Sequence, residues 1–357
     1  MTQTGLIRVL VIDDSAYSRR TISRMLETSP LVEVVGWARD GEEALRKALQ
    51  LRPDLVTLDL EMPRMDGFTF LRLLMAKRPT PVLVVSGRSR DEDVFRALEL
   101  GAVDFIAKPS QRAAPELGTI QEELIRKVHA TRQLRMDKVR ERISQAPAPV
   151  RSHAARDGRL RVVAIGSSTG GPAALMQIFG AFSEAPDCAF VVSQHMPEGF
   201  TRGFAERIDR LTPVAAQEAR GGEEIRRGAV LLAPGGYHLE FESRGGTAVA
   251  RLVPRAAEDK YAPSVDRMFE SAAKAFGRDL LAVVLTGMGD DGRRGVRAVR
   301  EAGGAVIAES EETAVIFGMP QQAIRTGAVD AVLPLPEIAM AIQTGIPRAP
   351  RDGEGRV

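Results

Sequence analysis

Strand-length apolar runs alternate with amphipathic stretches of helix length along most of the chain, and no other feature limits the fold as strongly. The first five runs are IRVLVID, VEVVGW, LVTLDL, VLVVSG and DFIAK. The helical stretches between them cover residues 17–27, 42–51, 68–77 and 91–100. Strands that alternate with helices form a parallel sheet with helices on both faces. We therefore predict a doubly wound α/β domain over residues 5–125.

A second alternation begins at Leu160 and predicts a second doubly wound, Rossmann-like α/β domain over residues 160–346. Its strands are RVVAIG, CAFVVSQ, VLLAP, LLAVVLTG, AVIAES and DAVLPL, and HLEFES pairs with AVARLVP as a small hairpin. Helices are expected from Pro172, Gly199 and Asp291 and near Gln321. Residues 126–159 are expected to be a charged helical extension that ends in a flexible linker. The tail 347–357 is expected to be disordered.

Composition excludes several classes of protein. The 357 residues are too many for one ordinary domain, and 49 basic against 47 acidic residues give no bulk attraction to nucleic acid. A single cysteine, Cys188, excludes an intrachain disulfide and fits a reducing compartment. The N-terminal sequence lacks a signal-peptide pattern, and apolar runs such as residues 280–285 are too short to span a membrane. We expect a soluble cytoplasmic protein without membrane insertion.

Acidic and polar residues follow the strands of the first domain. Asp13 and Asp14 end the first strand, Asp59 the third, Ser86 the fourth and Lys108 the fifth. Functional groups gather at the carboxyl ends of parallel strands, and three converging carboxylates suit Mg²⁺. A carboxylate beside Mg²⁺ and a lysine can attack a phosphoryl group. One such aspartate would more often be a cap or a turn former, but five positions in register favour a phosphoryl-transfer site.

The segments VIDDSAYSRR, LDLEMPRMDG, VVSG and DFIAKP resemble the response-regulator receiver domain over roughly residues 5–125. This resemblance implies a flavodoxin-like fold in which Asp59 accepts phosphate from a histidine kinase. It also implies that the carboxylates of Asp13, Asp14 and Asp59 bind Mg²⁺, together with the backbone carbonyl of Glu61.

The same resemblance assigns the switch residues. It implies that Ser86 and Lys108 contact the phosphoryl oxygens and that Phe105 is the aromatic switch. Gly87 departs from the more usual small or hydroxyl residue, which could alter the movement of the switch loop.

In the second domain, residues 166–170 read Gly-Ser-Ser-Thr-Gly, between the strand RVVAI and a helix that opens at Pro172. This G-x-S-x-G pattern in a strand-to-helix turn is typical of a nucleophile elbow, with Ser168 as the nucleophile. A glycine-rich turn after a strand can also bind phosphate or simply connect two elements tightly. No lysine follows the glycines, as a Walker loop would require.

A serine nucleophile needs a base. Of the four histidines, His129 and His153 lie in the charged extension and linker and are expected to be ordinary surface residues. His238 lies in the predicted hairpin and is a weak candidate for a role near the site. His195 closes the strand CAFVVSQ at the edge where Ser168 also lies, although a lone histidine there is more often structural.

The acid would come from Asp290 or Asp291, which follow the strand LLAVVLTG. One of the two would usually cap the next helix. Serine, histidine and aspartate nevertheless all end parallel strands on one side of one sheet, which favours a catalytic triad. Their order along the chain differs from that of α/β-hydrolases.

The segments GSSTGGP, SQHMPEGFT and LTGMGDDG resemble the catalytic domain of the bacterial chemotaxis protein-glutamate methylesterase family, over roughly residues 160–345. The resemblance implies that Ser168 is the nucleophile, His195 the base and Asp291 the residue that orients it. Ser167 stands where alanine is common. Asp290 stands where asparagine is common, and it adds negative charge beside Asp291 that could raise the pKa of the histidine.

The two resemblances together imply a regulated enzyme. Its substrates would be glutamate γ-methyl esters on methyl-accepting chemoreceptors, and a chemotaxis histidine kinase would be the phosphodonor. The same serine esterase site could in principle deamidate glutamine, because only the leaving group changes. No metal or other cofactor is expected in the hydrolase domain.

Two other classes of function compete with this one. Receiver domains most often regulate DNA-binding outputs, but the chain has no helix-turn-helix segment and no concentrated basic face. A non-catalytic signalling scaffold is the second alternative. The candidate triad argues against it, and an esterase assay would decide between the two.

Overall fold

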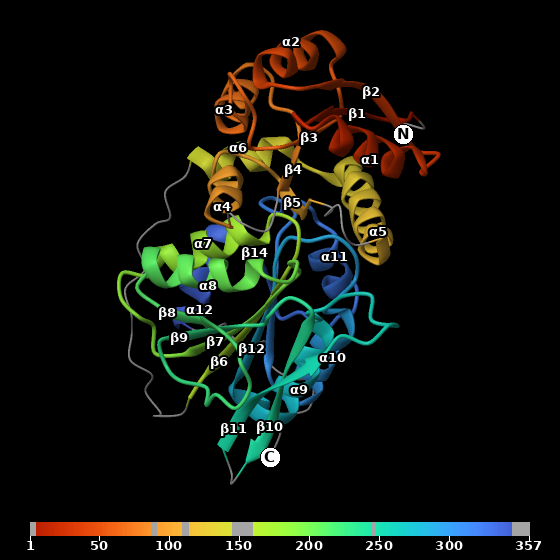
Figure 1. Ribbon diagram of the computed structural model, residues 1–357. Helices are drawn as coiled ribbons and strands as arrows, with labels where there is room; N and C mark the ends of the chain where they lie inside the picture. The colour runs from red at the N-terminus through yellow and green to blue at the C-terminus, as the bar shows by residue number, and fades with distance from the viewer. Residues whose placement is uncertain (1–4, 87–90, 109–113, 145–159, 245–246, 345–357) are drawn as a thin grey trace, which may run out of the picture. The chain divides into compact units, whose positions relative to one another are not determined.

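The computed structural model describes residues 5–86, 91–108, 114–144, 160–244 and 247–344 (Figure 1). The chain divides into two compact units, Met1–Gln145 and Ala146–Val357. The predicted linker from residue 145 to 159 and the predicted tail lie outside the described residues. Within the described part of the chain, no helix is both long enough and apolar enough to cross a membrane.

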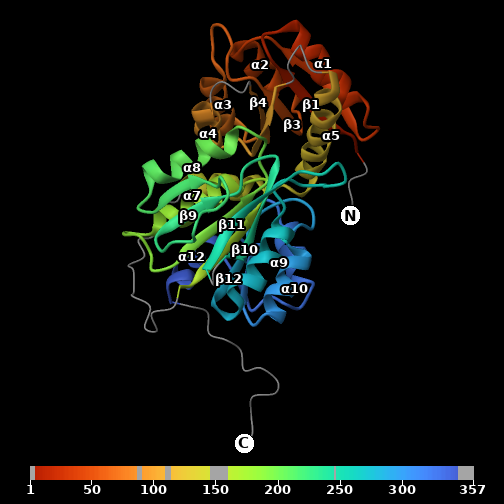
Figure 2. The same cartoon turned by 60° about the horizontal axis from the view of Figure 1, so that its bottom comes forward.

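The first unit contains one five-stranded sheet. Its elements, in chain order, are β1 (Ile7–Ile12), α1 (Ala16–Glu27), β2 (Val32–Ala38), α2 (Gly41–Leu51), β3 (Leu55–Leu58), α3 (Gly67–Lys77), β4 (Val82–Ser86), α4 (Asp91–Glu99), β5 (Asp104–Ala107), α5 (Ala114–Ala130), η1 (Thr131–Gln133) and α6 (Met136–Ser144). The strands are parallel in the order β2-β1-β3-β4-β5, the flavodoxin-like order. Helices α1 and α5 pack together, as do α2 and α3, on opposite faces of the sheet (Figures 1 and 2). The doubly wound prediction is confirmed.

The second unit is built on a seven-stranded parallel sheet. Its elements are β6 (Val162–Ser167), α7 (Gly171–Ala181), β7 (Ala189–Gln194), α8 (Phe200–Leu211), β8 (Ala215–Glu218), β9 (Ala229–Leu232), β10 (Tyr237–Arg244), β11 (Thr247–Pro254), α9 (Val265–Phe276), η2 (Gly277–Asp279), β12 (Leu280–Val284), α10 (Arg293–Glu301), β13 (Ala305–Glu309), α11 (Met319–Ile324), β14 (Ala331–Leu333) and α12 (Leu335–Thr344). The order is β14-β13-β12-β6-β7-β9-β8, and β10 and β11 form a separate antiparallel hairpin.

The order of the strands fixes where the site of this unit lies. From β6 the chain first adds β7 on one side, and it later returns to add β12 on the other side. Ligands bind at such a switch point, outside the carboxyl ends of the strands. Helices α7, α8 and α12 cover one face of the sheet, and α9, α10 and α11 cover the other (Figure 1).

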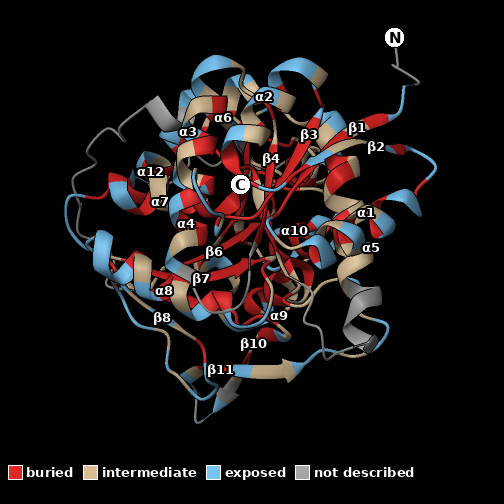
Figure 3. Ribbon diagram, turned by 45° about the horizontal axis from the view of Figure 1, so that its top comes forward, coloured by how far each residue is buried: buried red, intermediate tan, exposed pale blue. Residues whose placement is uncertain are grey.

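Burial explains why the central strands are continuous apolar runs. Every residue of β6 and β7 is buried, because helices cover both faces of the sheet (Figure 3). Phe179 of α7 packs edge-on against Phe190 of β7, with ring centroids 5.2 Å apart. The outward faces of the helices are exposed, as Figure 3 shows.

The sequence did not predict every element. Strand β8 has the sequence AAQE with alternating exposed and half-buried positions, and it lies at the edge of the sheet. Two alanines and four residues give little strand signal. Helix α9 was also not predicted, although Ser264 caps it and apolar residues recur at helical spacing from Val265. Helix α12 was missed as well, and the helix predicted from Asp291 begins at Arg293.

Candidate active site and candidate phosphoryl-acceptor site

The turn after β6 is held tightly by the backbone. Ser168 N donates to Thr286 O at 3.1 Å, and Gly171 N donates to Ser168 O at 2.8 Å. Gly170 has φ +79°, a conformation that favours glycine. A Cβ at Gly171 would lie 2.0 Å from Gln194 Oε1, so the helix that follows can approach β7 only with glycine there.

The two adjacent serines differ in their surroundings. Ser167 is fully buried, and its hydroxyl donates to Gln194 Oε1 at 2.7 Å. Ser168 is half-buried. The amide of Gln194 in turn donates to Ser168 O at 3.0 Å and to His195 O at 2.9 Å. Of the two hydroxyls, only that of Ser168 is on a residue open to a substrate.

His195 lies beside this turn because β6 and β7 are paired. Ser167 is the register partner of Gln194, and His195 N donates to Ser167 O at 3.0 Å. The His195 ring then reaches the β12–α10 loop, where its Nε2 lies 2.8 Å from Asp291 Oδ2. The structure therefore brings Ser168, His195 and Asp291 to one edge of one sheet.

Asp291 is buried and accepts four hydrogen bonds. Besides His195, the donors are the hydroxyl of Ser264 at 3.0 Å and the backbone amides of Val265 at 2.7 Å and Asp266 at 2.8 Å. Burial opposes ionisation, but the hydrogen bonds from His195 and the amides outweigh it and hold the pKa of Asp291 below its ordinary value.

The ionised Asp291 fixes the tautomer of His195. A carboxylate can only accept, so the proton of the neutral imidazole is on Nε2 and the lone pair is on Nδ1. That Nδ1 atom is buried and has no hydrogen-bond partner among the described residues. Buried polar atoms are rarely left unpaired, and where they are, a catalytic role is one explanation.

Asp290 does not behave as a second acid of the site. Its side chain is 55% exposed, and its carboxylate pairs with Lys260 Nζ at 3.2 Å, so a cation offsets the added negative charge. The expectation that Asp290 or Asp291 caps the next helix is wrong. Helix α10 follows Gly292, and the amides of Arg294 and Gly295 donate to Asp266 instead.

Several residues around the site were missed by the sequence reasoning. Tyr261 stacks on His195 with ring centroids 4.3 Å apart and an interplanar angle of 9°. Ser264 and Asp266 open α9, and the helix-cap pattern before the apolar residues of α9 was the signal that could have found them. His238 is fully buried and bonds to Asp259 at 2.8 Å, so it does not face a substrate directly.

The other predicted histidines lie elsewhere. His129 is half-buried in the first unit, and its Nε2 lies 2.9 Å from Ser29 Oγ. His153 is outside the described residues.

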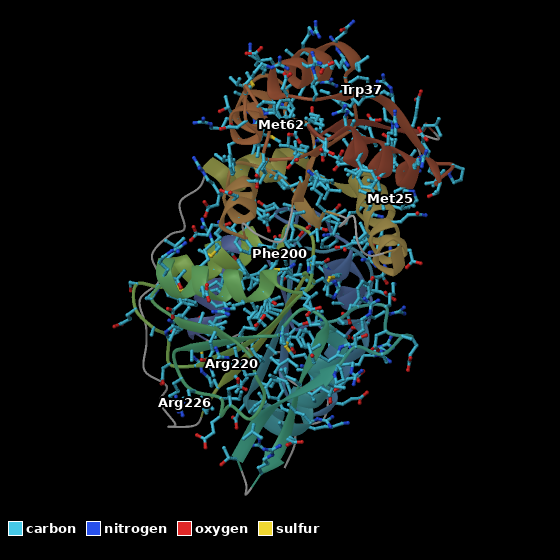
Figure 4. All side chains as sticks on the ribbon, in the orientation of Figure 1. Met25, Trp37, Met62, Phe200, Arg220 and Arg226 are labelled. Carbon is cyan, nitrogen blue, oxygen red and sulfur yellow. The ribbon has the colours of Figure 1, made fainter. Side chains whose placement is uncertain are left out.

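A surface groove of about 710 Å³ runs along β8, β9 and the connection between them. Figure 4 labels Arg220 and Arg226 of this connection. None of Ser168, His195 and Asp291 lines it.

In the first unit, carboxylates gather as predicted. Oxygens of Asp13, Asp14 and Asp59 lie within 4.8 Å of one another, with Asp13 and Asp59 buried and Asp14 exposed. Lys108 Nζ lies 2.6 Å from Asp59 Oδ2 and 3.0 Å from Asp13 Oδ2. Burial raises the pKa of both buried carboxyls. Desolvation disfavours the charged form of Lys108, but the two aspartates outweigh it and raise its pKa.

This donor set fits a divalent cation. Three carboxylates in so small a volume repel one another unless positive charge is supplied, and oxygen ligands are those that Mg²⁺ prefers. Phe105 is buried in β5, and Lys127 lies over its ring at 5.4 Å and donates to its carbonyl at 2.6 Å. Ser86 ends β4, but its side chain is outside the described residues, as is Gly87.

Comparison with known proteins finds matches to both units of the chain. The family model "CheB methylesterase" matches residues 163–342, and the model "Response regulator receiver domain" matches residues 9–116. A Geobacter sulfurreducens protein named protein-glutamate methylesterase/protein-glutamine glutaminase 3 is 54% identical, over 94% of this chain and 96% of its own length. A Myxococcus xanthus protein named protein-glutamate methylesterase/protein-glutamine glutaminase 1 is 50% identical over 96% of this chain and 98% of its own length.

A solved structure is also similar to the second unit. The crystal structure of the Thermotoga maritima CheB methylesterase catalytic domain is 39% identical and has a TM-score of 0.51. The match covers 53% of this chain and all of that one. The chain therefore belongs to the CheB methylesterase family and joins its hydrolase unit to a response-regulator receiver domain.

Proposed function

We propose that this protein hydrolyses glutamate γ-methyl esters in proteins, under the control of phosphorylation of its receiver. The names of the relatives, which are similar over nearly the whole chain, support this activity. Those names also include protein-glutamine glutaminase, so the same site is proposed to deamidate glutamine, a reaction that differs in its leaving group.

One observation carries the proposal. His195 binds the buried Asp291 through Nε2 and keeps a buried, unpartnered Nδ1 beside the turn that presents Ser168, within the part of the chain that the structure describes. A nucleophile, a base and a group that orients the base are what acyl transfer by serine requires.

The reaction follows from these roles. Ser168 Oγ forms a bond to the ester carbonyl carbon while its proton passes to His195 Nδ1, and the carbonyl oxygen becomes an oxyanion. Collapse of this intermediate breaks the bond to the methoxy group, which takes the proton from Nδ1 and leaves as methanol. Water then gives a proton to Nδ1 and attacks the acyl carbon. Collapse of this second intermediate breaks the bond to Ser168 Oγ, which takes the proton back from Nδ1, and releases the glutamate side chain.

The surroundings of Ser168 favour the charged intermediate. Helix α7 begins at Gly171, directly after the turn, and no side chain caps it. The positive end of a helix dipole stabilises a nearby anion, and stabilisation of an oxyanion is often the largest part of such catalysis. Asp291 in turn stabilises the imidazolium that forms on His195.

The receiver is proposed to be phosphorylated on Asp59. The carboxylates of Asp13, Asp14 and Asp59 would hold Mg²⁺, which would offset the negative charge on the transferring oxygens. Lys108 already lies at hydrogen-bond distance from Asp59 and is proposed, together with Ser86, to contact the phosphoryl group. Phe105 is proposed to be the aromatic switch residue, which changes its position when Asp59 is phosphorylated.

The partners follow from the family. We propose that the protein acts in the cytoplasm, that its substrates are methyl-accepting chemoreceptors and that its phosphodonor is a chemotaxis histidine kinase. The buried hydrogen bond of Ser167 and the openness of Ser168 support the choice of nucleophile.

Ser168→Ala tests the proposed function, with Ser167→Ala as the matched control. The first change should lower release of methanol from a peptide with a glutamate γ-methyl ester by about 10³-fold or more. The second removes one hydrogen bond from Gln194, which keeps its bonds to the carbonyls of residues 168 and 195, so much of the activity should remain. If Ser167→Ala were the inactive variant and Ser168→Ala the active one, the assignment would be wrong.

A further inference from the structure

Residues 255–263 of the connection between β11 and α9 lie against the proposed base, and we call this segment the strap. Tyr261 of the strap stacks on His195, with ring centroids 4.3 Å apart and planes 9° from parallel. The His195 side chain is 11% exposed. One edge of the imidazole is thus held by Asp291, and one face is covered by a phenol ring.

Two side chains of the strap, those of Asp259 and Lys260, anchor it to other parts of the second unit. Asp259 accepts from the backbone amide of Ala256 at 2.7 Å and bonds to His238 Nε2 at 2.8 Å. Lys260 pairs with Asp290 at 3.2 Å, and its ammonium lies 4.9 Å from the centre of the Tyr261 ring. These contacts hold the backbone that leads into Tyr261.

The first anchor is a buried histidine with a defined tautomer. The backbone amide of Ser264 donates to His238 Nδ1 at 3.2 Å, so this nitrogen carries the lone pair and Nε2 carries the proton. His238 is fully buried in β10 and therefore holds Asp259 with one nitrogen and Ser264 with the other.

Ser264 extends the line of contacts to the proposed acid. Its hydroxyl donates to Asp291 Oδ1 at 3.0 Å and accepts from the amide of Arg267 at 3.4 Å. One continuous set of hydrogen bonds therefore runs from Asp259 through His238 and Ser264 to Asp291. Tyr261 of the strap therefore contacts His195, and Ser264, which follows the strap, contacts Asp291.

We infer that the strap aligns His195 for proton transfer and that Tyr261 is a positioning residue. The inference rests on the proposed roles of His195 and Asp291. A single hydrogen bond at Nε2 fixes a distance but leaves the ring free to rock about that bond, which would swing Nδ1 away from Ser168. A stacked ring restricts this rocking.

The aromatic face also suits the charge that develops. Proton uptake turns His195 into an imidazolium, and a cation is attracted to the face of an aromatic ring. An aliphatic side chain of similar size would fill the same space without this attraction. The ring of Tyr261, rather than its hydroxyl, is the part that acts on His195.

Three full-length variants test the inference. Tyr261→Leu removes the ring, Tyr261→Phe keeps it, and Tyr17→Leu makes the same change at a tyrosine of the receiver that is 47% exposed. The assay is methanol release from a peptide with a glutamate γ-methyl ester, with kcat and KM determined separately.

We expect Tyr261→Leu to lower kcat by about 10- to 100-fold while KM stays within about threefold, because small misplacements of a catalytic group have effects of this size. Tyr261→Phe should recover at least about half of kcat, since the stacked ring is retained. Tyr17→Leu should match the unmodified protein.

Other outcomes overturn the inference. Wild-type kcat in Tyr261→Leu, an equal loss in Tyr261→Phe, or a change in KM alone would each show that the ring does not align the base. His195→Ala is measured alongside. If His195→Ala retained full activity, the proposed function itself would be wrong. If His195→Ala were inactive and Tyr261→Leu fully active, only the proposed role of Tyr261 would be wrong.

A second variant covers the case in which Tyr261→Leu does not fold. Lys260→Ala removes the exposed anchor to Asp290 without emptying any core, since the Lys260 side chain is 62% exposed. It should lower kcat by about two- to fivefold with little change in KM, because the strap loses the ion pair next to Tyr261. An unchanged kcat in Lys260→Ala would overturn the proposed role of the strap.

Discussion

Asp291 accepts hydrogen bonds from His195, which directly follows β7, from Ser264 and from the first two amides of α9, so four donors share two oxygens. Every one of these donors keeps the carboxylate ionised, and the ionised carboxylate keeps the lone pair of His195 on Nδ1. At the scale of single residues, each side chain of the candidate site thus sets the ionisation or the tautomer of its neighbour.

The first residue-scale prediction concerns additivity. His195→Ala and Asp291→Asn should each lower turnover of the ester by about 10²- to 10⁴-fold, because one removes the proposed base and the other disturbs its tautomer. Either change combined with Ser168→Ala should add less than about threefold, since the three residues act as one unit. Multiplicative losses in the double variants, measured by methanol release, would argue that they do not share a mechanism.

The second concerns Cys188, the single cysteine of the chain. Burial raises the pKa of its thiol to about 12. At pH 7 to 8 the thiolate, which is the reactive form, is therefore scarce as well as inaccessible. The native protein should not react with a thiol reagent over an hour, whereas the protein in urea should react with one equivalent. Rapid reaction of the folded protein would contradict the buried position of Cys188.

At the scale of elements, helix ends are fixed by individual caps. Asp66 precedes α3 and accepts from the Thr69 amide at 2.7 Å, a hydrogen bond that holds the pKa of Asp66 below its ordinary value. Asp66→Ala should lower the free energy of unfolding of the receiver by about 1 kcal/mol. The single tryptophan, Trp37, lies in β2 of this unit (Figure 4), so its fluorescence follows receiver unfolding in the full chain.

The same cap predicts a pH dependence. The folded pKa of Asp66 is depressed, so its ionic contribution is fully present above the unfolded value near 3.8 and is lost as the pH falls through the lower folded value. Asp66→Asn keeps a capping side chain without charge and should be close to the unmodified protein at pH 7. An equal loss of stability in Asp66→Asn and Asp66→Ala would show that charge, rather than capping, dominates.

The sequence predicted those elements whose signal is local. Long β-branched runs predicted the inner strands of both sheets, and strand-end residues predicted the convergence of Ser168, His195 and Asp291. The glycine spacing selected Ser168 over Ser167, but the sequence could not show the contact that occupies Ser167, because it comes from Gln194 on the neighbouring strand. Tyr261 was missed for the same reason, since its partner His195 is distant in the sequence and meets it only in the folded chain.

At the scale of the whole molecule, two units with separate sheets are joined in one chain. Asp59→Asn should abolish activation by a small-molecule phosphodonor without abolishing basal turnover, because the proposed esterase residues all lie in the second unit. Removal of Mg²⁺ with a chelator should have the same selective effect. Loss of basal esterase activity with the chelator would mean that the hydrolase also depends on a metal.

The direction of control gives the last prediction. If the unphosphorylated receiver restrains the hydrolase by about 2 kcal/mol, a few per cent of molecules are active and phosphorylation can raise the rate tens of fold. A chain that lacks residues 1–155 should then have a higher basal rate of methanol release than the full chain. A lower rate would indicate that the receiver helps to recruit or hold the substrate.

The strand order of the hydrolase sheet has a consequence for how the protein is made. Its central strand, β6, comes first along the chain, but its neighbour β12 is separated from it by β7 to β11 and the helices between them. A ribosome releases the chain from its N-terminus, and domains fold as units. All five strands of the receiver emerge before β6, so the receiver can fold during synthesis. In the hydrolase sheet, β6 cannot pair with β12 until the chain has emerged beyond residue 284. A nascent chain therefore has a complete receiver before it has a complete hydrolase unit.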